Sequence, residues 1–232
     1  MRRIRLISIV VAVILLGGMA IAIFRAREPR YQGRTLTEWI ERAEPASNKS
    51  WVHPSLTSLW LYDPTDPAWQ AASNAVKQIG PDAVPLLLKW AQTKDSPSKS
   101  KLIAWLHAHP SLHFQFKPAD EYHFRALFGF ASLGNEAKPA WPALKQMIED
   151  RDSKCRICAL NCLAKSQPDQ ETLLPVLLRL IHDPDRHVQY NAGLIFRSRY
   201  SRDAETAGVY KIFPGWKNFL TPQTNAGVTS AK

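Results

Sequence analysis

Apolar and polar residues follow the same order in two stretches of the chain that lie 33 residues apart. Apolar residues recur there at the spacing of one helix face, at Leu144, Met147 and Ile148 and again at Leu177, Leu180 and Ile181. No gap interrupts the correspondence. A fixed period in this range is typical of stacked helix–turn–helix units. The pattern therefore predicts an all-α fold.

A short polar turn and a second helix follow each of these helices. The turns cover residues 149–152 and 182–185, and each ends in an aspartate, Asp152 or Asp185, placed to accept hydrogen bonds from the first amides of the next helix. The buried stripes expected on the second helices are Cys155, Ala159 and Leu163 in one copy and Val188, Ala192 and Phe196 in the other.

A third, more divergent copy lies upstream, where residues 79–85 match residues 133–139 at an offset of 54. Gly80 and Gly134 are expected at helix C-termini, where a residue with positive φ is needed. The offset exceeds 33, so it indicates an insert at about 97–117. We expect one extra helix, from Ser98 to His107, and a loop in this insert.

The patterns Asp152-x-x-Cys155-x-x-x-Ala159 and Asp185-x-x-Val188-x-x-x-Ala192 resemble the HEAT repeat, including the type related to phycobilisome lyase repeats. The segments 31–39 (YQGRTLTEW) and 127–134 (LFGFASLG) are similar to those of membrane-anchored HEAT proteins common in Verrucomicrobia-type bacteria. The resemblance implies a short right-handed α-solenoid of HEAT-like helical pairs, preceded by one N-terminal transmembrane helix.

Residues 6–24 form a run of nineteen residues without a charge. As a helix this run is about 28 Å long, close to the thickness of a bilayer's hydrocarbon core. A cleaved signal peptide is the alternative, but its apolar core is usually shorter. We expect a retained single-pass anchor in a bacterial cytoplasmic membrane, with the body on the periplasmic side. The membrane-flanking arginines are Arg2, Arg3, Arg5, Arg25, Arg27 and Arg30.

The predicted organisation places these parts in order. It comprises a basic tail at 1–5, the anchor at 6–24, a juxtamembrane linker and N-terminal cap at 25–66, HEAT-like repeats at 67–200, a C-terminal cap at 201–220 and a disordered tail at 221–232. Thr35 and Glu38 form a candidate capping box within the N-terminal cap. Four tryptophans are expected to pack between that cap and the first repeat: Trp39, Trp51, Trp60 and Trp69.

The formal net charge of +10 divides unevenly along the chain. Residues 1–34 carry +6 and residues 35–232 carry +4, so most of the excess is suited to anionic lipid headgroups next to the anchor. A possible basic patch remains at Arg197, Arg199 and Arg202. The mildly basic body and its expected export argue against nucleic acid as a partner.

Three cysteines, Cys155, Cys158 and Cys162, share one stripe of a predicted helix. We interpret them as buried small apolar residues. A redox C-x-x-C motif usually follows a strand, and no strands are predicted here; zinc would need a second ligand pair. The cysteines therefore give no catalytic, cofactor or metal assignment.

Four histidines gather in and after the insert, at His107, His109, His113 and His123. Imidazole suits Zn, Cu or Ni, so a metal site is one interpretation; polar loop histidines are the other. No phosphate-binding glycine loop, G-x-S-x-G elbow or H-E-x-x-H motif is present in the sequence. No catalytic residue and no cofactor are assigned.

The function expected from these features is a non-catalytic, membrane-tethered scaffold for an unidentified protein or peptide, because stacked repeats create extended binding surfaces. The candidate partner-binding turns comprise Arg151, Asp152, His182, Asp183, Asp185 and His187. Two alternatives stay open: a HEAT-type enzyme similar to a bilin lyase, and a nucleic-acid-binding HEAT protein.

Overall fold

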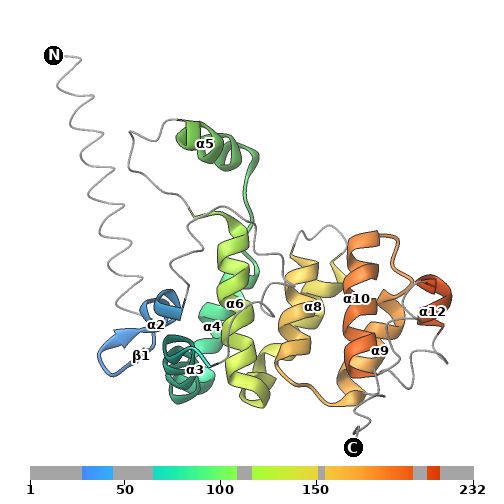
Figure 1. Ribbon diagram of the computed structural model, residues 1–232, viewed down its shortest axis with the longest axis horizontal. Coiled ribbons are helices and arrows are strands. Elements are labelled where there is room, and N and C mark those ends of the chain that lie inside the picture. The colour runs from blue at the N-terminus through green and yellow to red at the C-terminus, as the bar shows by residue number, and fades with distance from the viewer. Residues whose placement is uncertain (1–27, 44–64, 109–116, 151–154, 201–207, 215–232) are drawn as a thin grey trace, which may run out of the picture. The chain divides into compact units, whose positions relative to one another are not determined.

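A computed structural model describes residues 28–43, 65–108, 117–150, 155–200 and 208–214 of the chain. Most of these residues lie in helices, and a two-stranded antiparallel hairpin is the one sheet among them (Figure 1). The predicted all-α class is confirmed at this level. Within the described ranges, no helix has both the length and the apolar character needed to cross a bilayer. The predicted span at 6–24 lies outside these ranges.

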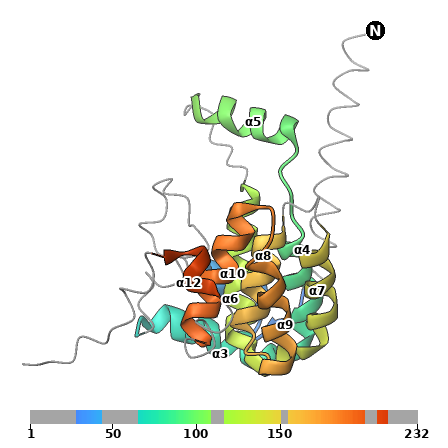
Figure 2. The same cartoon turned by 90° about the vertical axis from the view of Figure 1, so that its right-hand side faces the viewer.

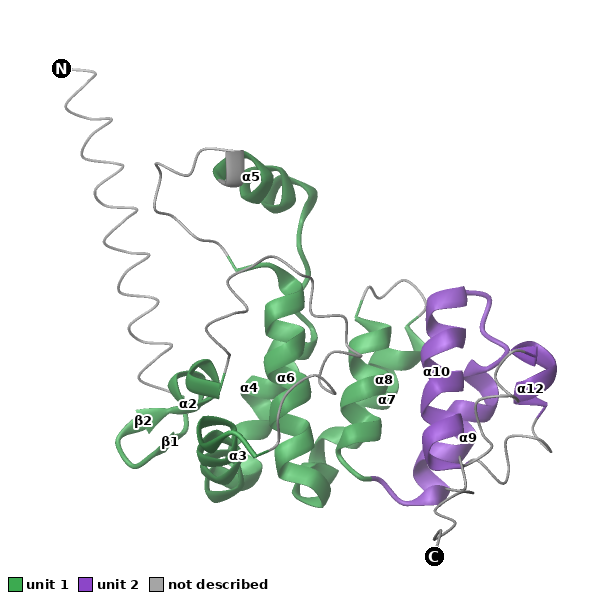
Figure 3. Cartoon of the chain, in the orientation of Figure 1, with its two compact units in different colours: residues 1–167 green, residues 168–232 purple. Residues whose placement is uncertain are grey.

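The chain divides into two compact units, residues 1–167 and residues 168–232 (Figure 3). The sequence predicted one continuous repeat block at 67–200. The boundary between the two units instead falls between the two copies that are 33 residues apart. In unit 1 the described elements are β1 (Arg30–Tyr31), β2 (Arg34–Thr35), α2 (Leu36–Ala43), α3 (Pro67–Ile79), η3 (Gly80–Ala83), α4 (Val84–Ala91), α5 (Pro97–Ala108), α6 (Ala119–Leu133), η4 (Gly134–Ala140), α7 (Trp141–Glu149) and α8 (Arg156–Lys165). In unit 2 they are α9 (Gln170–Leu180), α10 (Arg186–Arg199) and α12 (Val209–Ile212).

The hairpin at the start of unit 1 corrects the expectation that the chain has no strands. Arg30 pairs with Thr35 and Tyr31 pairs with Arg34. The two residues between the strands, Gln32 and Gly33, have φ values of 49° and 76°. Positive φ at both positions suits the tight turn of a two-residue hairpin, which glycine adopts at low cost.

Helix α2 begins with the predicted capping box. The Glu38 amide donates to Thr35 Oγ1 at 3.2 Å, and the Thr35 amide donates to Glu38 Oε2 at 2.8 Å. Trp39 is buried, and its Nε1 donates to the Tyr31 carbonyl at 3.0 Å. Helix α2 packs on α3, so the segment 28–43 belongs to the folded body of unit 1.

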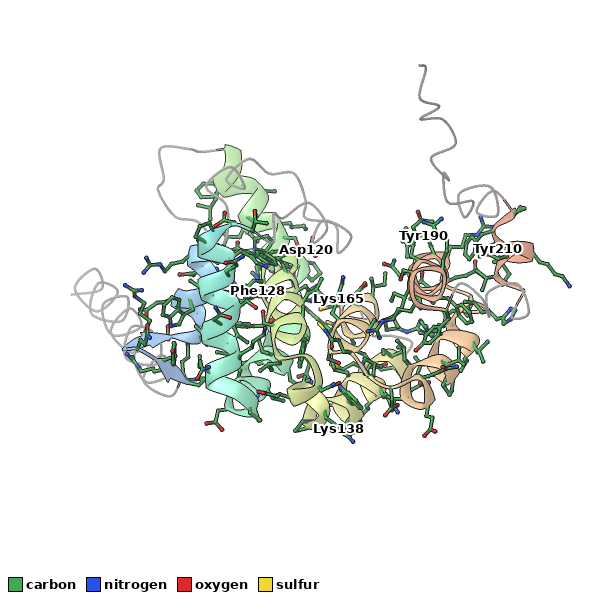
Figure 4. The ribbon with its side chains drawn as sticks, turned by 60° about the horizontal axis from the view of Figure 1, so that its bottom comes forward. Asp120, Phe128, Lys138, Lys165, Tyr190 and Tyr210 are labelled. Carbon is green, nitrogen blue, oxygen red and sulfur yellow. The ribbon has the colours of Figure 1, made fainter. Side chains whose placement is uncertain are left out.

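The core of unit 1 forms where α3, α4 and α8 pack around α6. Phe128, labelled in Figure 4, lies on α6 with its ring centroid 4.5 Å from that of Trp69 on α3, edge to face. Gly129 lies where α6 meets α4, since a Cβ atom at this position would collide with the Leu87 side chain. The close approach of these two helices therefore depends on a glycine.

Two glycines end α3 and α6 as predicted. Gly80 has φ 64° and Gly134 has φ 56°, and each leads through a short 3-10 segment into the next α-helix, α4 or α7. Positive φ turns the chain sharply at little cost for glycine alone. The two predicted helix ends are therefore confirmed.

The apolar positions paired at an offset of 33 residues are all buried. Leu144, Ile148, Ala159 and Leu163 in unit 1 and Leu177, Ile181, Ala192 and Phe196 in unit 2 are each 0% exposed. In unit 2, α9 packs on α10 and α12 contacts α10. The Tyr190 ring, labelled in Figure 4, meets Phe213 edge to face with centroids 6.2 Å apart.

Candidate functional site

The turn between α9 and α10 in unit 2 carries four of the predicted partner-binding residues. Asp185 Oδ1 accepts hydrogen bonds from the amides of His187, at 2.8 Å, and Val188, at 3.4 Å, which confirms its predicted capping role. His182 and His187 are exposed on this turn. These two imidazoles are available for contact with a partner.

Asp183 has a different role from the one predicted. It is buried, and its Oδ1 accepts a hydrogen bond from the Asp185 amide at 2.9 Å. A carboxylate that bonds the backbone of its own turn holds that turn in shape. We therefore assign Asp183 to stabilising the α9–α10 turn, in place of the predicted contact with a partner.

The equivalent turn of unit 1 includes Arg151 and Asp152, which lie outside the described residues. The residues on either side, Asp150 and Cys155, correspond to Asp183 and Val188 at the offset of 33. Both line a half-open depression of about 510 Å³. Its other lining residues are Gln92, Lys94, Ala143, Gln146 and Met147.

The depression combines an apolar floor with a polar rim. Met147 and Cys155 are buried, and the Cys155 thiol donates to the Thr93 carbonyl at 3.5 Å. Four exposed side chains form the rim: Gln92, Lys94, Gln146 and Asp150. The sequence analysis missed the two glutamines and the lysine. The sequence feature that could have drawn attention to them is their position near the C-terminal ends of α4 and α7, two helices that precede loops.

Cys158 and Cys162 are buried in α8 and Cys155 is buried at its N-cap, as predicted. Cys158 Sγ lies 3.8 Å from Cys162 Sγ. The hydrogen bond with Cys162 and burial raise the pKa of the Cys158 thiol well above its usual range. The thiol stays protonated at neutral pH, and a protonated thiol is a poor nucleophile and a poor metal ligand.

The predicted histidine cluster is represented by His123, since His109 and His113 lie outside the described residues and His107 is described only as part of the α5 backbone. His123 Nε2 lies 2.8 Å from the Thr93 carbonyl, which requires that Nε2 carry a proton. Its Nδ1 lies 3.9 Å from Asp120 Oδ1. Burial lowers the pKa of His123 despite Asp120 and Asp95 nearby. Among the described side chains, no group of three or more His, Cys, Asp or Glu residues is arranged to hold a metal ion.

A network of charged side chains joins α2 to α6. Arg125 is buried, and its guanidinium donates to Glu41, at 2.9 Å, and Glu121, at 3.1 Å. Lys117 bridges the same two carboxylates, at 3.0 Å and 2.6 Å. Burial alone would raise the pKa of Glu41, but Lys117 and Arg125 outweigh it and hold that pKa below its usual range. Lys117, Glu121 and Arg125 follow one another at i, i+4 spacing, but no local motif indicates Glu41, which lies 76 residues before Lys117.

The predicted basic residues are only partly described. Arg197 and Arg199 lie in the last turn of α10, the first half-buried and the second exposed, and Arg202 lies outside the described residues. Arg30 is exposed on β1, where its Nη1 donates to the Gly33 carbonyl at 3.3 Å. Arg2, Arg3, Arg5, Arg25 and Arg27 also lie outside the described residues.

Comparison with protein-family models, with curated proteins and with solved structures yields no match for this chain.

Proposed function

We propose that this protein is a membrane-tethered, non-catalytic scaffold of HEAT-like helical pairs, and that it binds a peptide segment of a partner protein in the depression of unit 1. The observation that carries the proposal is the composition of that depression. Its rim and floor supply hydrogen-bonding amides, both signs of charge and a buried apolar surface within one concave site.

The solenoid part of the proposal is supported by the burial of equivalent positions. The first and second helices of the two copies bury the same residues at an offset of 33, including the alanines Ala159 and Ala192. Helices that bury a matching stripe and carry a small residue at its centre suit close stacking of neighbouring pairs.

The peptide part is supported by the chemistry of the rim. Gln92 and Gln146 each offer an amide that donates and accepts hydrogen bonds, as the backbone of an extended peptide requires. Lys94 and Asp150 offer opposite charges that would orient a peptide. Met147 supplies a deformable apolar floor for one inserted side chain.

A photocrosslinking experiment tests the proposed site. A benzophenone amino acid replaces Gln146 in the full chain, which is expressed in the membranes of its own cells and irradiated. The matched control carries the same probe at Gln78, an exposed glutamine of α3 that does not line the depression. We expect a discrete covalent adduct with one protein at Gln146 and none at Gln78. The substitution Lys94→Glu should remove the adduct.

Equal adducts at both positions, or none at Gln146, would contradict the proposed site. Purification of the full chain also separates the proposal from the two alternatives. A bound pigment with visible absorbance would favour an enzyme similar to a bilin lyase, and salt-dependent binding of DNA by the chain would favour a nucleic-acid-binding protein.

A further inference from the structure

Helix α5 is the part of the insert that the structure describes, and it agrees with the extra helix expected there. It makes few contacts with the other described elements, and it stands away from the packed helices of unit 1 in both views (Figures 1 and 2). The chain on each side of it is fixed to the body. Thr93 accepts hydrogen bonds from His123 and Cys155, and Asp95 Oδ2 accepts one from the Ala119 amide at 2.8 Å.

Two large apolar side chains are exposed on α5, among exposed serines and a lysine. Leu102 is 43% exposed and Trp105 is 50% exposed, and a separation of three residues places them on the same face. They are the two large exposed apolar residues of unit 1 among those described. A tryptophan beside an aliphatic residue on one face is suited to a boundary between water and hydrocarbon.

The charge on and beside this helix is positive. Helix α5 contains Lys99 and Lys101 and no acidic residue, and Lys94 precedes it. Lys99 is paired with Asp95 at 2.6 Å, whereas Lys101 and Lys94 are exposed. The combination of exposed lysines with an apolar face complements an anionic lipid surface.

The position of the predicted anchor adds a second argument. Its apolar run ends at residue 24 and the described body begins at residue 28, so the intervening chain reaches only about 15 Å even when fully extended. Unit 1 would therefore be held at the bilayer surface.

We infer that α5 is an interfacial helix that lies on the anionic lipid surface beside the predicted anchor, with Trp105 and Leu102 at the level of the headgroups and Lys101 at the phosphates. This inference rests on the tether in the proposed function and adds a second membrane contact to it. The contact would fix the orientation of unit 1 on the bilayer.

The test uses the full chain, reconstituted in vesicles of phosphatidylcholine alone or mixed with phosphatidylglycerol. A cysteine at Ser98, an exposed position of α5 that lies four residues before Leu102 and seven before Trp105 and so shares their face, carries an environment-sensitive NBD label. The three native cysteines are at most 1% exposed, so they stay unlabelled. The matched control carries the label at Ala71, an exposed alanine of α3 in the same unit.

We expect the label at position 98, in vesicles that contain phosphatidylglycerol, to emit at shorter wavelength and to be quenched by doxyl-labelled lipid. The label at position 71 should do neither. The double substitution Leu102→Ser and Trp105→Ser should abolish the shift and the quenching at position 98.

Flotation of the same vesicles reports on the tether by itself. A chain that floats while the label at position 98 behaves like the label at position 71 overturns the role of α5 and leaves the tether intact. A label that is shifted but not quenched by lipid also overturns it, because a protein surface then covers the helix. A chain that does not float overturns both the tether and the α5 contact.

Discussion

The guanidinium of Arg125 on α6 lies 2.9 Å from the carboxylate of Glu41 on α2, which is 84 residues earlier in the chain. The Arg125 side chain is 2% exposed, and the carboxylates of Glu41 and Glu121 compensate its buried positive charge. The ion pair joins the segment next to the predicted anchor to the central helix of unit 1. The ion pair therefore ties α2 to the core of unit 1.

Removing the Glu41 charge should destabilise unit 1. We expect Glu41→Gln to lower the free energy of unfolding by about 1–3 kcal/mol, because a buried guanidinium loses one of its charged partners while Glu121 remains. Denaturant unfolding of the detergent-solubilised full chain, followed by tryptophan fluorescence, measures the change. Asp82→Asn, at an exposed position of η3, is the control and should have little effect.

The contribution of Glu41 should also depend on pH. Its pKa in the folded protein lies below the ordinary value of 4.5, so its stabilising effect is present above that value and is lost as pH falls through the folded pKa. The difference in stability between wild type and Glu41→Gln should therefore shrink in acid. A difference that persists unchanged at low pH would show that the carboxylate charge is not its source.

His123 should make the fold sensitive to mild acid. Burial lowers its pKa below the ordinary 6.5, so the folded state binds this proton less readily than the unfolded state. The contribution of neutral His123 to the free energy of unfolding is therefore fully present above pH 6.5, and it is lost as pH falls through the folded pKa. In His123→Gln, whose amide can still donate to Thr93, this decline should be smaller. Unfolding midpoints measured at several pH values test this, with His182→Gln as an exposed control.

Gly129 should not tolerate a methyl group. Alanine gains about 1 kcal/mol over glycine in helix propensity, but a collision with the fully buried Leu87 side chain costs about 1–3 kcal/mol. We expect Gly129→Ala to lower the unfolding midpoint, whereas Ala131→Ser, at a half-buried position of the same helix, should change it little. An increase in the midpoint for Gly129→Ala would mean that α4 and α6 do not approach as described.

The two aspartates of the α9–α10 turn should affect stability, whereas the neighbouring exposed histidine should not. We expect Asp183→Ala and Asp185→Ala each to cost about 1 kcal/mol, since each removes an acceptor for backbone amides. His187→Ala should stay within about 0.5 kcal/mol of wild type. Thermal unfolding of the three variants checks the order, and an equal loss for His187→Ala would contradict it.

Local features were predictable from the sequence because each is set by a few adjacent residues. The Asp185 cap, the Thr35–Glu38 capping box and the positive φ of Gly80 and Gly134 all follow from side-chain chemistry within one turn of helix. The burial of Cys155 followed from its correspondence to Val188 in the other copy.

Features that depend on distant segments were not predictable in the same way. The contact of Gly129 with Leu87 and the pairing of Arg125 with Glu41 arise only when helices from different parts of the chain meet. The depression needed the ends of α4 and α7 to be brought together, so the helix-end positions of Gln92 and Gln146 could not indicate that the two side chains share one site. Asp183 was misassigned because a polar residue in a turn resembles a surface residue until its hydrogen bond is known.

The hydrogen bonds at Thr93 and Asp95 close the base of the insert that carries α5. Because both ends of the insert are held by the body, changes in its length or sequence need not disturb α3, α4 or α6. Substitutions in α5 could therefore alter the proposed membrane contact by themselves, while the helices that surround the depression keep their packing.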